Sequence, residues 1–270
     1  MTVRILQADS VTRLCAAHAG HVVVTGSHGG MIAAAYAANA QVRAAVFNDA
    51  GRGCDDAGVA GLAALDRIGV AAVAVTHLSA RIGDAADTFA HGIVGACNLV
   101  AMALGIGVGM RCHDAAHRLL VAPWRQGVVA VPQESRSLLA PQSTGHAPVW
   151  ALDSIGLVAA VDSGAVLVIG SHGALHGGDP ASALPVDARA AFFHDAGRGK
   201  DDAGTTRLPV LALRGMPAAT VDYRSARIGD ARSMWSTGVL SVVNAPAAAR
   251  GVAVGMRLRD AAMRLRIGIA

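Results

Sequence analysis

The sequence predicts an α/β protein of two similar lobes, each built from βα repeats around a parallel sheet and related by a pseudo-twofold axis. Two observations lead there: the chain repeats its own motifs at a nearly constant spacing, and continuous apolar runs alternate with helical segments within each copy. Strands buried on both faces of a parallel sheet have this continuously apolar character. With 53% apolar and 16% charged residues, the chain can form a packed core, and the composition excludes a disordered protein.

Four motifs occur twice, 144 to 146 residues apart. They are SHG at 27–29 and 171–173, DAGRG-x-DDAG at 49–58 and 195–204, SARIGDA at 79–85 and 225–231, and the related segments 107–119 and 253–265. A period this long indicates an internal duplication of a small domain rather than a solenoid of short repeats. We therefore predict lobes at residues 3–121 and 147–267, joined by a Pro- and Gln-rich connector at 122–146.

The elements of the first copy are predicted in order from apolar runs and their punctuation. Asp9 and Ser10 resemble a helix N-cap, and Gly20 ends that predicted helix. The segments that follow alternate: strand 21–25, helix 31–40, strand 42–47, helix 59–68, strand 70–76, helix 93–104 and strand 106–111. In the second copy, ALHGGDPASALP replaces the helix expected after SHG.

Membrane insertion is the alternative for residues 92–110, which carry no charge and are long enough to cross a bilayer. The matching segment 238–256 contains Pro246 and Arg250, so we predict a buried helix and strand instead, and no membrane partner. No signal peptide is recognised at the N-terminus. None of the four cysteines has a cysteine at the matching position, which favours buried free thiols in the cytoplasm.

The net charge of +4 comes almost wholly from arginine, since Lys200 is the only lysine. The arginines are scattered and only nine aromatic residues are present. Nucleic-acid binding sites combine a clustered basic surface with aromatic stacking. We therefore predict no nucleic-acid partner.

The three polar motifs each follow a predicted strand. The carboxyl ends of parallel strands share one edge of the sheet, and ligands bind at that edge in open α/β sheets. The motifs are thus predicted to meet at a binding site. Differences between the copies leave open whether there are two unequal sites or one site built from both lobes.

The SHG motif places backbone N–H groups before a helix, an arrangement that suits an anion. His28 and His172 are the only histidines that occur in both copies, and we predict them as acid–base catalysts; a buried, hydrogen-bonded structural histidine is the alternative. A serine nucleophile needs a small residue two positions before it, and Ile169 does not fit. Predicted substrate-binding residues of this motif are Ser27, Gly29, Ser171 and Gly173.

The DAGRG motif supplies carboxylates and a guanidinium. Asp49 and Asp195 directly follow a strand and are predicted as catalytic general bases. Arg52 and Arg198 are predicted to bind substrate. The second acidic pair of the motif has a simpler explanation, because one of its members can cap the next helix.

The SARIGDA motif adds an arginine that can hold a carboxylate with two parallel hydrogen bonds. An internal Arg–Asp ion pair is the alternative. The predicted substrate-binding residues are Ser79, Arg81 and Asp84 in the first copy and Ser225, Arg227 and Asp230 in the second.

Together these residues predict an enzyme, most simply a hydrolase of an amide or related bond, acting on a small anionic substrate by His/Asp acid–base chemistry without a cofactor. A lyase or isomerase would use the same residues. A divalent metal held by His28, Asp49 and Asp84 is a second alternative, and a non-catalytic binding protein is a third. The low charge content favours a homo-oligomer.

Overall fold

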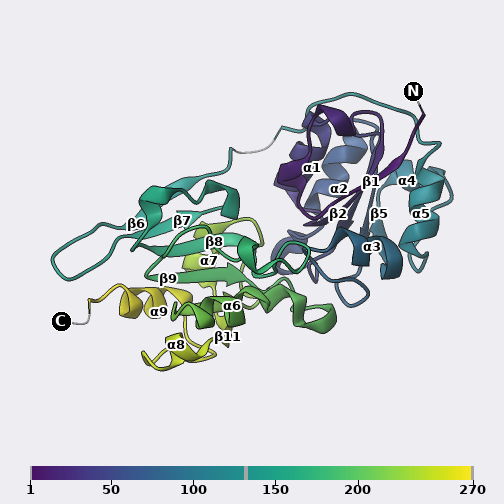
Figure 1. The fold of residues 1–270 in the computed structure, drawn as a ribbon. Coiled ribbons are helices and arrows are strands. Elements are labelled where there is room, and N and C mark those ends of the chain that lie inside the picture. The colour runs from purple at the N-terminus through teal and green to yellow at the C-terminus, as the bar shows by residue number, and fades with distance from the viewer. Residues whose placement is uncertain (1, 131–132, 269–270) are drawn as a thin grey trace.

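The computed structural model describes residues 2–130 and 133–268, which form two lobes side by side (Figure 1). The first lobe has a five-stranded sheet in the order β1-β2-β3-β4-β5 and the second a six-stranded sheet in the order β11-β10-β9-β8-β7-β6. The α/β prediction with two similar lobes is confirmed. The sheets are mixed rather than purely parallel, because β5, β6 and β11 each pair antiparallel with their neighbour.

The bounds of the elements are similar in the two lobes. The first lobe contains strands β1 (Ile5–Ala8), β2 (Val22–His28), β3 (Ala44–Asn48), β4 (Ala71–Val75) and β5 (Val94–Cys97), and helices α1 (Met31–Asn39), α2 (Ala60–Arg67), α3 (Ala85–His91), α4 (Leu99–Ala103) and α5 (Cys112–Leu119). The second lobe contains strands β6 (Arg136–Ala140), β7 (Val149–Leu152), β8 (Val166–His172), β9 (Ala190–His194), β10 (Ala218–Val221) and β11 (Leu240–Val243), and helices α6 (Arg207–Leu213), α7 (Ala231–Thr237), α8 (Ala245–Ala248) and α9 (Leu258–Leu265).

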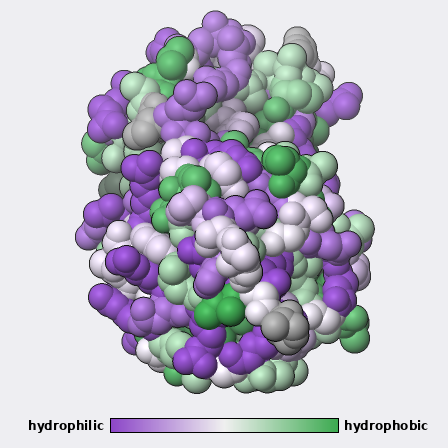
Figure 2. Space-filling view, turned by 90° about the vertical axis from the view of Figure 1, so that its left-hand side faces the viewer, coloured by the Kyte–Doolittle hydropathy of each residue, from purple (hydrophilic) through white to green (hydrophobic). Residues whose placement is uncertain are grey.

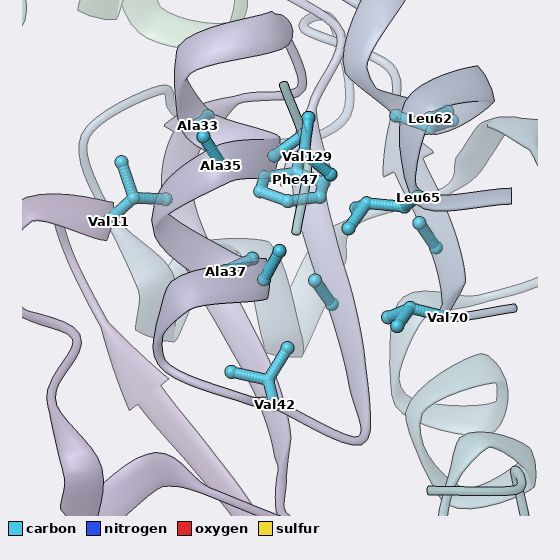
Figure 3. Close-up of a cluster of buried hydrophobic side chains, with 14 of the residues drawn as sticks. Val11, Ala33, Ala35, Ala37, Val42, Phe47, Leu62, Leu65, Val70 and Val129 are labelled. Atoms are coloured by element: carbon cyan, nitrogen blue, oxygen red, sulfur yellow. The ribbon is translucent and has the colours of Figure 1, made fainter. Parts of the chain in front are cut away.

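Each sheet is covered on both faces, which explains its continuously apolar strands. In the first lobe, α1 and α2 pack on one face around the fully buried Phe47, and Figure 3 shows this ring among the side chains of both helices. The opposite face packs against α5 through Ala115, Ala116 and Leu119. Ala-rich α1 therefore lies close to the sheet, because its side chains are small.

The connector belongs partly to each lobe. Val129 is buried in the core between α1 and α2 (Figure 3), and the Trp124 indole N–H donates to the carbonyl of Gln41 at 2.9 Å. Farther along, β6 adds an antiparallel strand to the outer edge of β7. Residues 131 and 132, inside the predicted connector, lie outside the described residues.

Several local predictions are wrong. The helix predicted from Ser10 to Gly20 is two short 3-10 turns, Val11–Arg13 and Ala16–His18, preceded by the unpredicted strand β1. Residues 93–104 begin as β5 and only then form α4, and 106–111 form a loop rather than a strand. The helices and strands predicted at 31–40, 42–47, 59–68 and 70–76 are confirmed within a few residues.

Surface properties qualify two further expectations. The four cysteines are free thiols, but Cys15 is exposed and only Cys112 is buried. None of the helices formed by residues 2–130 and 133–268 has the length and apolar character that a bilayer span requires. On the face presented by the second lobe, hydrophobic side chains are scattered among hydrophilic ones (Figure 2).

Candidate functional site

The two lobes meet through the loops at the carboxyl ends of their strands, so the motifs of one lobe contact those of the other. The backbone N–H of Cys54 donates to the carbonyl of Tyr223 at 2.9 Å, and that of Lys200 donates to the carbonyl of His77 at 2.8 Å. A small apolar cluster that includes Ala50 and Ala196 closes the contact. The predicted site edge is therefore an interface between the lobes.

The DAGRG loops need their glycines, because four consecutive residues adopt left-handed backbone in each copy, at 50–53 and 196–199. Asp49 Oδ1 accepts hydrogen bonds from the backbone N–H groups of Gly51 and His77 at 2.9 and 2.8 Å. Asp195 makes the same two bonds in the second copy, to Gly197 and Tyr223, and burial raises its pKa. Both carboxylates hold the loop to the next strand, and neither lines the cavities described below.

The arginines of SARIGDA cross between the lobes. Arg81 Nη1 lies 3.0 Å from Asp201, and Arg227 Nε lies 2.6 Å from Asp55. Their neighbours Asp84 and Asp230 accept from backbone N–H groups at the starts of α3 and α7. Both arginines therefore form the ion pairs of the alternative interpretation. Arg227 and Asp230 also line a cavity.

Other predicted binding residues lie inside the loops or on the surface. Ser79 and Ser225 each donate to a carbonyl three residues earlier, at 2.8 and 2.7 Å. A Cβ on Gly173 would stand 2.5 Å from the carbonyl oxygen of Gly204, so this glycine permits a close backbone approach, as does Gly29. The exposed arginines Arg52 and Arg198 pair with aspartates four residues later.

The only lysine also joins the lobes. Lys200 Nζ lies 2.7 Å from the buried Asp87 of α3, which also accepts from the backbone N–H of Arg81 at 2.7 Å. Burial alone would raise the pKa of Asp87, but these hydrogen bonds hold it below its usual value. The matching residues in the other half, Cys54 and Ser233, carry no such charges, so only one side of the interface has this lock.

The SHG motifs form the part of the interface that encloses space. Ser27 Oγ accepts from the backbone N–H of Val11 at 3.0 Å, and Ser171 Oγ accepts from Ile155 at 2.8 Å. His28 Nδ1 accepts from the backbone N–H of Gly30 at 3.1 Å. His172 repeats this bond with Ala174 at 3.3 Å.

These backbone bonds determine what the histidine rings can do. Because Nδ1 accepts a hydrogen bond, a neutral ring carries its proton on Nε2. Burial, with repulsion from His194, lowers the pKa of His28 to about 4, although part of the ring still faces a cavity. Burial likewise holds the pKa of His172 well below its usual value, with repulsion from nearby groups that include His28. At neutral pH both rings are therefore uncharged Nε2–H donors.

Two adjoining cavities lie between the lobes at His28. The larger, of about 490 Å³, is lined by residues of both lobes that include His28, Met31, Asp55, Asp153, Arg227 and Asp230. The smaller, of about 60 Å³, is lined by Ser27, Ser171 and both histidines of the SHG motifs. Asp153 and Gly229 line both. The motifs of both copies thus contribute to one composite space.

Sequence reasoning missed several residues of this space. Glu134 and Tyr36 line the smaller cavity, and the Tyr36 hydroxyl donates to Glu134 Oε2 at 3.3 Å. Glu134 is the only glutamate in the chain, and this singularity could have indicated a special role. It lies in the connector, however, outside the repeats from which the site was predicted. Asp153 and Ser154 occupy the positions that match Asp9 and Ser10, the pair for which the sequence predicts a helix N-cap.

The larger cavity is lined by His28 and not by His172. After His172, residues 174–178 follow the motif where α1 follows it in the first lobe, and the Gly177 N–H donates to the carbonyl of Gly83 at 2.8 Å. A Cβ on Gly83 would stand 2.4 Å from the carbonyl oxygen of Leu175, whereas one on Gly229 would first meet the His28 ring, at 3.6 Å. Residues 174–175 thus pack directly on Gly83, whereas Gly229 leaves more room beside His28.

Among residues 2–130 and 133–268, no three His, Cys, Asp or Glu side chains are grouped so that they could hold a metal ion. This includes the set of His28, Asp49 and Asp84 that the metal alternative requires. Comparisons with protein-family models, curated proteins and solved structures gave no match. The function is therefore argued from the geometry of the site.

Proposed function

We propose that the protein is an enzyme that hydrolyses an amide or related carbonyl bond of a small molecule in the larger cavity. The observation that carries the proposal is His28. Its Nδ1 is occupied by the N–H of Gly30, and Nε2 has no hydrogen-bond partner among the described residues. A neutral Nε2–H that faces a cavity is suited to donate to a carbonyl oxygen as negative charge develops there.

Two neighbours complete the chemistry. Arg227 uses Nε for Asp55 and Nη1 for Asp230, which leaves Nη2 to bind a carboxylate or carbonyl oxygen of the substrate. Asp230 Oδ2 has only a long 3.4 Å bond to Arg227. We assign this oxygen the role of accepting a proton from the attacking water and of returning it to the departing nitrogen.

The proposal also includes the cellular location and the oligomeric state that the sequence predicts. Free thiols favour a reducing, cytoplasmic environment. Exposed apolar side chains of α4, Leu99 and Met102, favour a homo-oligomer. Sedimentation analysis of the wild type and of a Leu99→Glu variant tests the second point, since a change toward a smaller species is expected only if α4 lies in the contact.

The test of catalysis is ammonia release from a panel of small amides. His28→Gln is expected to lower kcat by about 100- to 1,000-fold, the usual effect of removing one oxyanion donor. His113→Gln, an exposed histidine of α5, is the matched control and should keep the wild-type rate. Wild-type turnover that survives His28→Gln unchanged would refute the assignment, as would failure of every amide in the panel to react.

A further inference from the structure

The smaller cavity contains two buried polar atoms that lack a partner. Glu134 Oε1 and Ser154 Oγ are both inaccessible to solvent and have no hydrogen-bond partner among the described residues. Both residues line this cavity. A buried carboxylate oxygen without a donor costs free energy, so the arrangement calls for a donor that the described residues do not supply.

The surroundings define the chemistry of that donor. The residues that line the smaller cavity include no Lys or Arg, and its two SHG histidines are kept uncharged by burial. His176, the third histidine of the wall, is also kept neutral, because burial lowers its pKa to about 4. No Lys or Arg side chain therefore lines this cavity beside the carboxylates of Glu134 and Asp153, and a cationic donor is favoured over an anion.

The cavity has room for a small cationic group. Its volume of about 60 Å³ can hold a few water-sized groups, since one water needs about 10–15 Å³ of such space. A primary ammonium group and its attached carbon fit there. Hydroxyl oxygens of Ser10 and Ser154 line the same cavity and can accept the remaining ammonium hydrogens.

We propose that the smaller cavity binds a primary ammonium group of the substrate, with Glu134 Oε1 and Ser154 Oγ as its acceptors. The cavities adjoin at His28, so the reacting carbonyl lies within a few bonds of the ammonium. This inference rests on the proposed function and names its substrate class: small amides that carry an amine, such as amino-acid amides. The larger cavity agrees, since its wall has three carboxylates (Asp55, Asp153 and Asp230) and one guanidinium, Arg227.

The test compares two probes of nearly equal shape, glycinamide and propionamide, by calorimetric titration of the wild-type protein at pH 7. The amine of glycinamide is mostly protonated there, because α-amino groups titrate near about 8. We expect glycinamide to bind about tenfold more tightly or better, as a charge-assisted hydrogen bond to a carboxylate predicts. Equal affinities would overturn the proposal and mean that the cavity holds water only.

Variants locate the effect. Glu134→Gln keeps the shape of the side chain and should bring the two affinities within about twofold, whereas Asp114→Asn, the same charge change at an exposed site, should preserve the preference. Ser154→Ala should reduce the preference about threefold. A preference that persists in Glu134→Gln would overturn the assignment even if the wild type discriminates.

His28→Gln separates this inference from the proposed function. If hydrolysis is absent in the wild type but glycinamide is still preferred through Glu134, the ammonium site stands and the catalytic proposal fails. If amides are hydrolysed through His28 with no preference for an amine, the catalytic proposal stands and the ammonium site fails.

Discussion

The two SHG segments begin alike and end differently. Both histidines accept a backbone N–H through Nδ1, and both strands pair with the next strand at the histidine itself. After His28 the chain forms α1 beside the larger cavity, and after His172 it forms an irregular segment that packs on Gly83. Equal motifs therefore do not imply equal sites, because the segment that follows decides whether space for a ligand remains.

The physical causes of that difference lie in a few residues. Gly177 and Gly178 adopt left-handed backbone and Pro180 follows, so a helix cannot continue through the segment. In the first lobe, Gly61 lets α1 and α2 approach, since a Cβ there would stand 2.4 Å from the Gly30 carbonyl oxygen. The matching Arg207 is fully buried and donates to the carbonyls of Ser182 and Ala183, and it thereby holds the irregular segment in place.

The ion pair between Lys200 and Asp87, which joins the lobes on one side only, should give the largest effect. Asp87→Ala should lower the free energy of unfolding by about 3–5 kcal/mol, because it leaves Lys200 without its buried partner. Ser233→Ala, the matched change, should cost about 1 kcal/mol or less, since only the hydrogen bond from the Arg227 N–H is lost. Urea denaturation of both variants measures the difference.

Equal losses for the two variants would mean that the interface has no stronger side. Cleavage by a protease in the connector provides a second readout. The lobes of the Asp87→Ala protein should separate after cleavage at a lower urea concentration than those of the wild type.

The matched residues His194 and Asn48 should also differ in their effect on stability at acid pH. His194 Nε2 donates to the Ala226 carbonyl and its Nδ1 accepts from the Ala196 N–H, and Asn48 makes the same pair of bonds in the first lobe. Burial lowers the pKa of His194 from 6.5 to about 4. Between these values the unfolded chain binds a proton that the folded chain does not, so stability falls as the pH falls from 6.5 toward 4.

His194→Asn should therefore shift acid unfolding to lower pH. At pH 4 it should raise the free energy of unfolding by up to about 3 kcal/mol, and at pH 7 it should change this free energy little. Asn48→His is the reverse control and should make the protein more acid-sensitive. Circular dichroism along a pH titration checks both, and identical acid midpoints for wild type and His194→Asn would contradict the explanation.

The matched glycines Gly83 and Gly229 should give the smallest effect. Gly83 and Gly229 both have positive φ, at 86° and 79°, so alanine is strained at either position. Gly83→Ala also meets the Leu175 carbonyl, whereas Gly229→Ala meets only the His28 ring edge. Gly83→Ala should thus lower the free energy of unfolding by about 1–2 kcal/mol more than Gly229→Ala does. The difference is measured as a lower melting temperature. A larger loss in Gly229→Ala would show that the His28 side is the more tightly packed one.

The sequence predicted best where local pattern and tertiary environment agree. The apolar strands β3 and β4 are buried on both faces, as their continuous apolar runs indicate, and the helices α1 and α2 pack on the same core. It failed at Ile106–Gly109, where four apolar or glycine residues form a loop closed by the Gly109 N–H to the Val94 carbonyl. It failed again at Ile5–Ala8, because a four-residue edge strand carries too short a pattern to recognise.

The site was predictable only in part. Repetition of SHG identified His28, but repetition could not show that Asp49 bonds to backbone N–H groups or that Arg81 pairs across the interface. Glu134 lies outside the repeats, and its position in the small cavity depends on how the connector crosses from one lobe to the other. Residues recruited from unique segments are invisible to a comparison of the two halves.

Because the lobes meet through the ends of their strands, each holds only half of the composite space. The first lobe is synthesised first and can bury its own core, yet His28 then faces solvent rather than a cavity. Ligand binding should therefore appear late during refolding, after the secondary structure has formed, and at a rate set by docking of the lobes rather than by folding of either one. Activity would thus report assembly of the pair, and a partly synthesised chain would be inert.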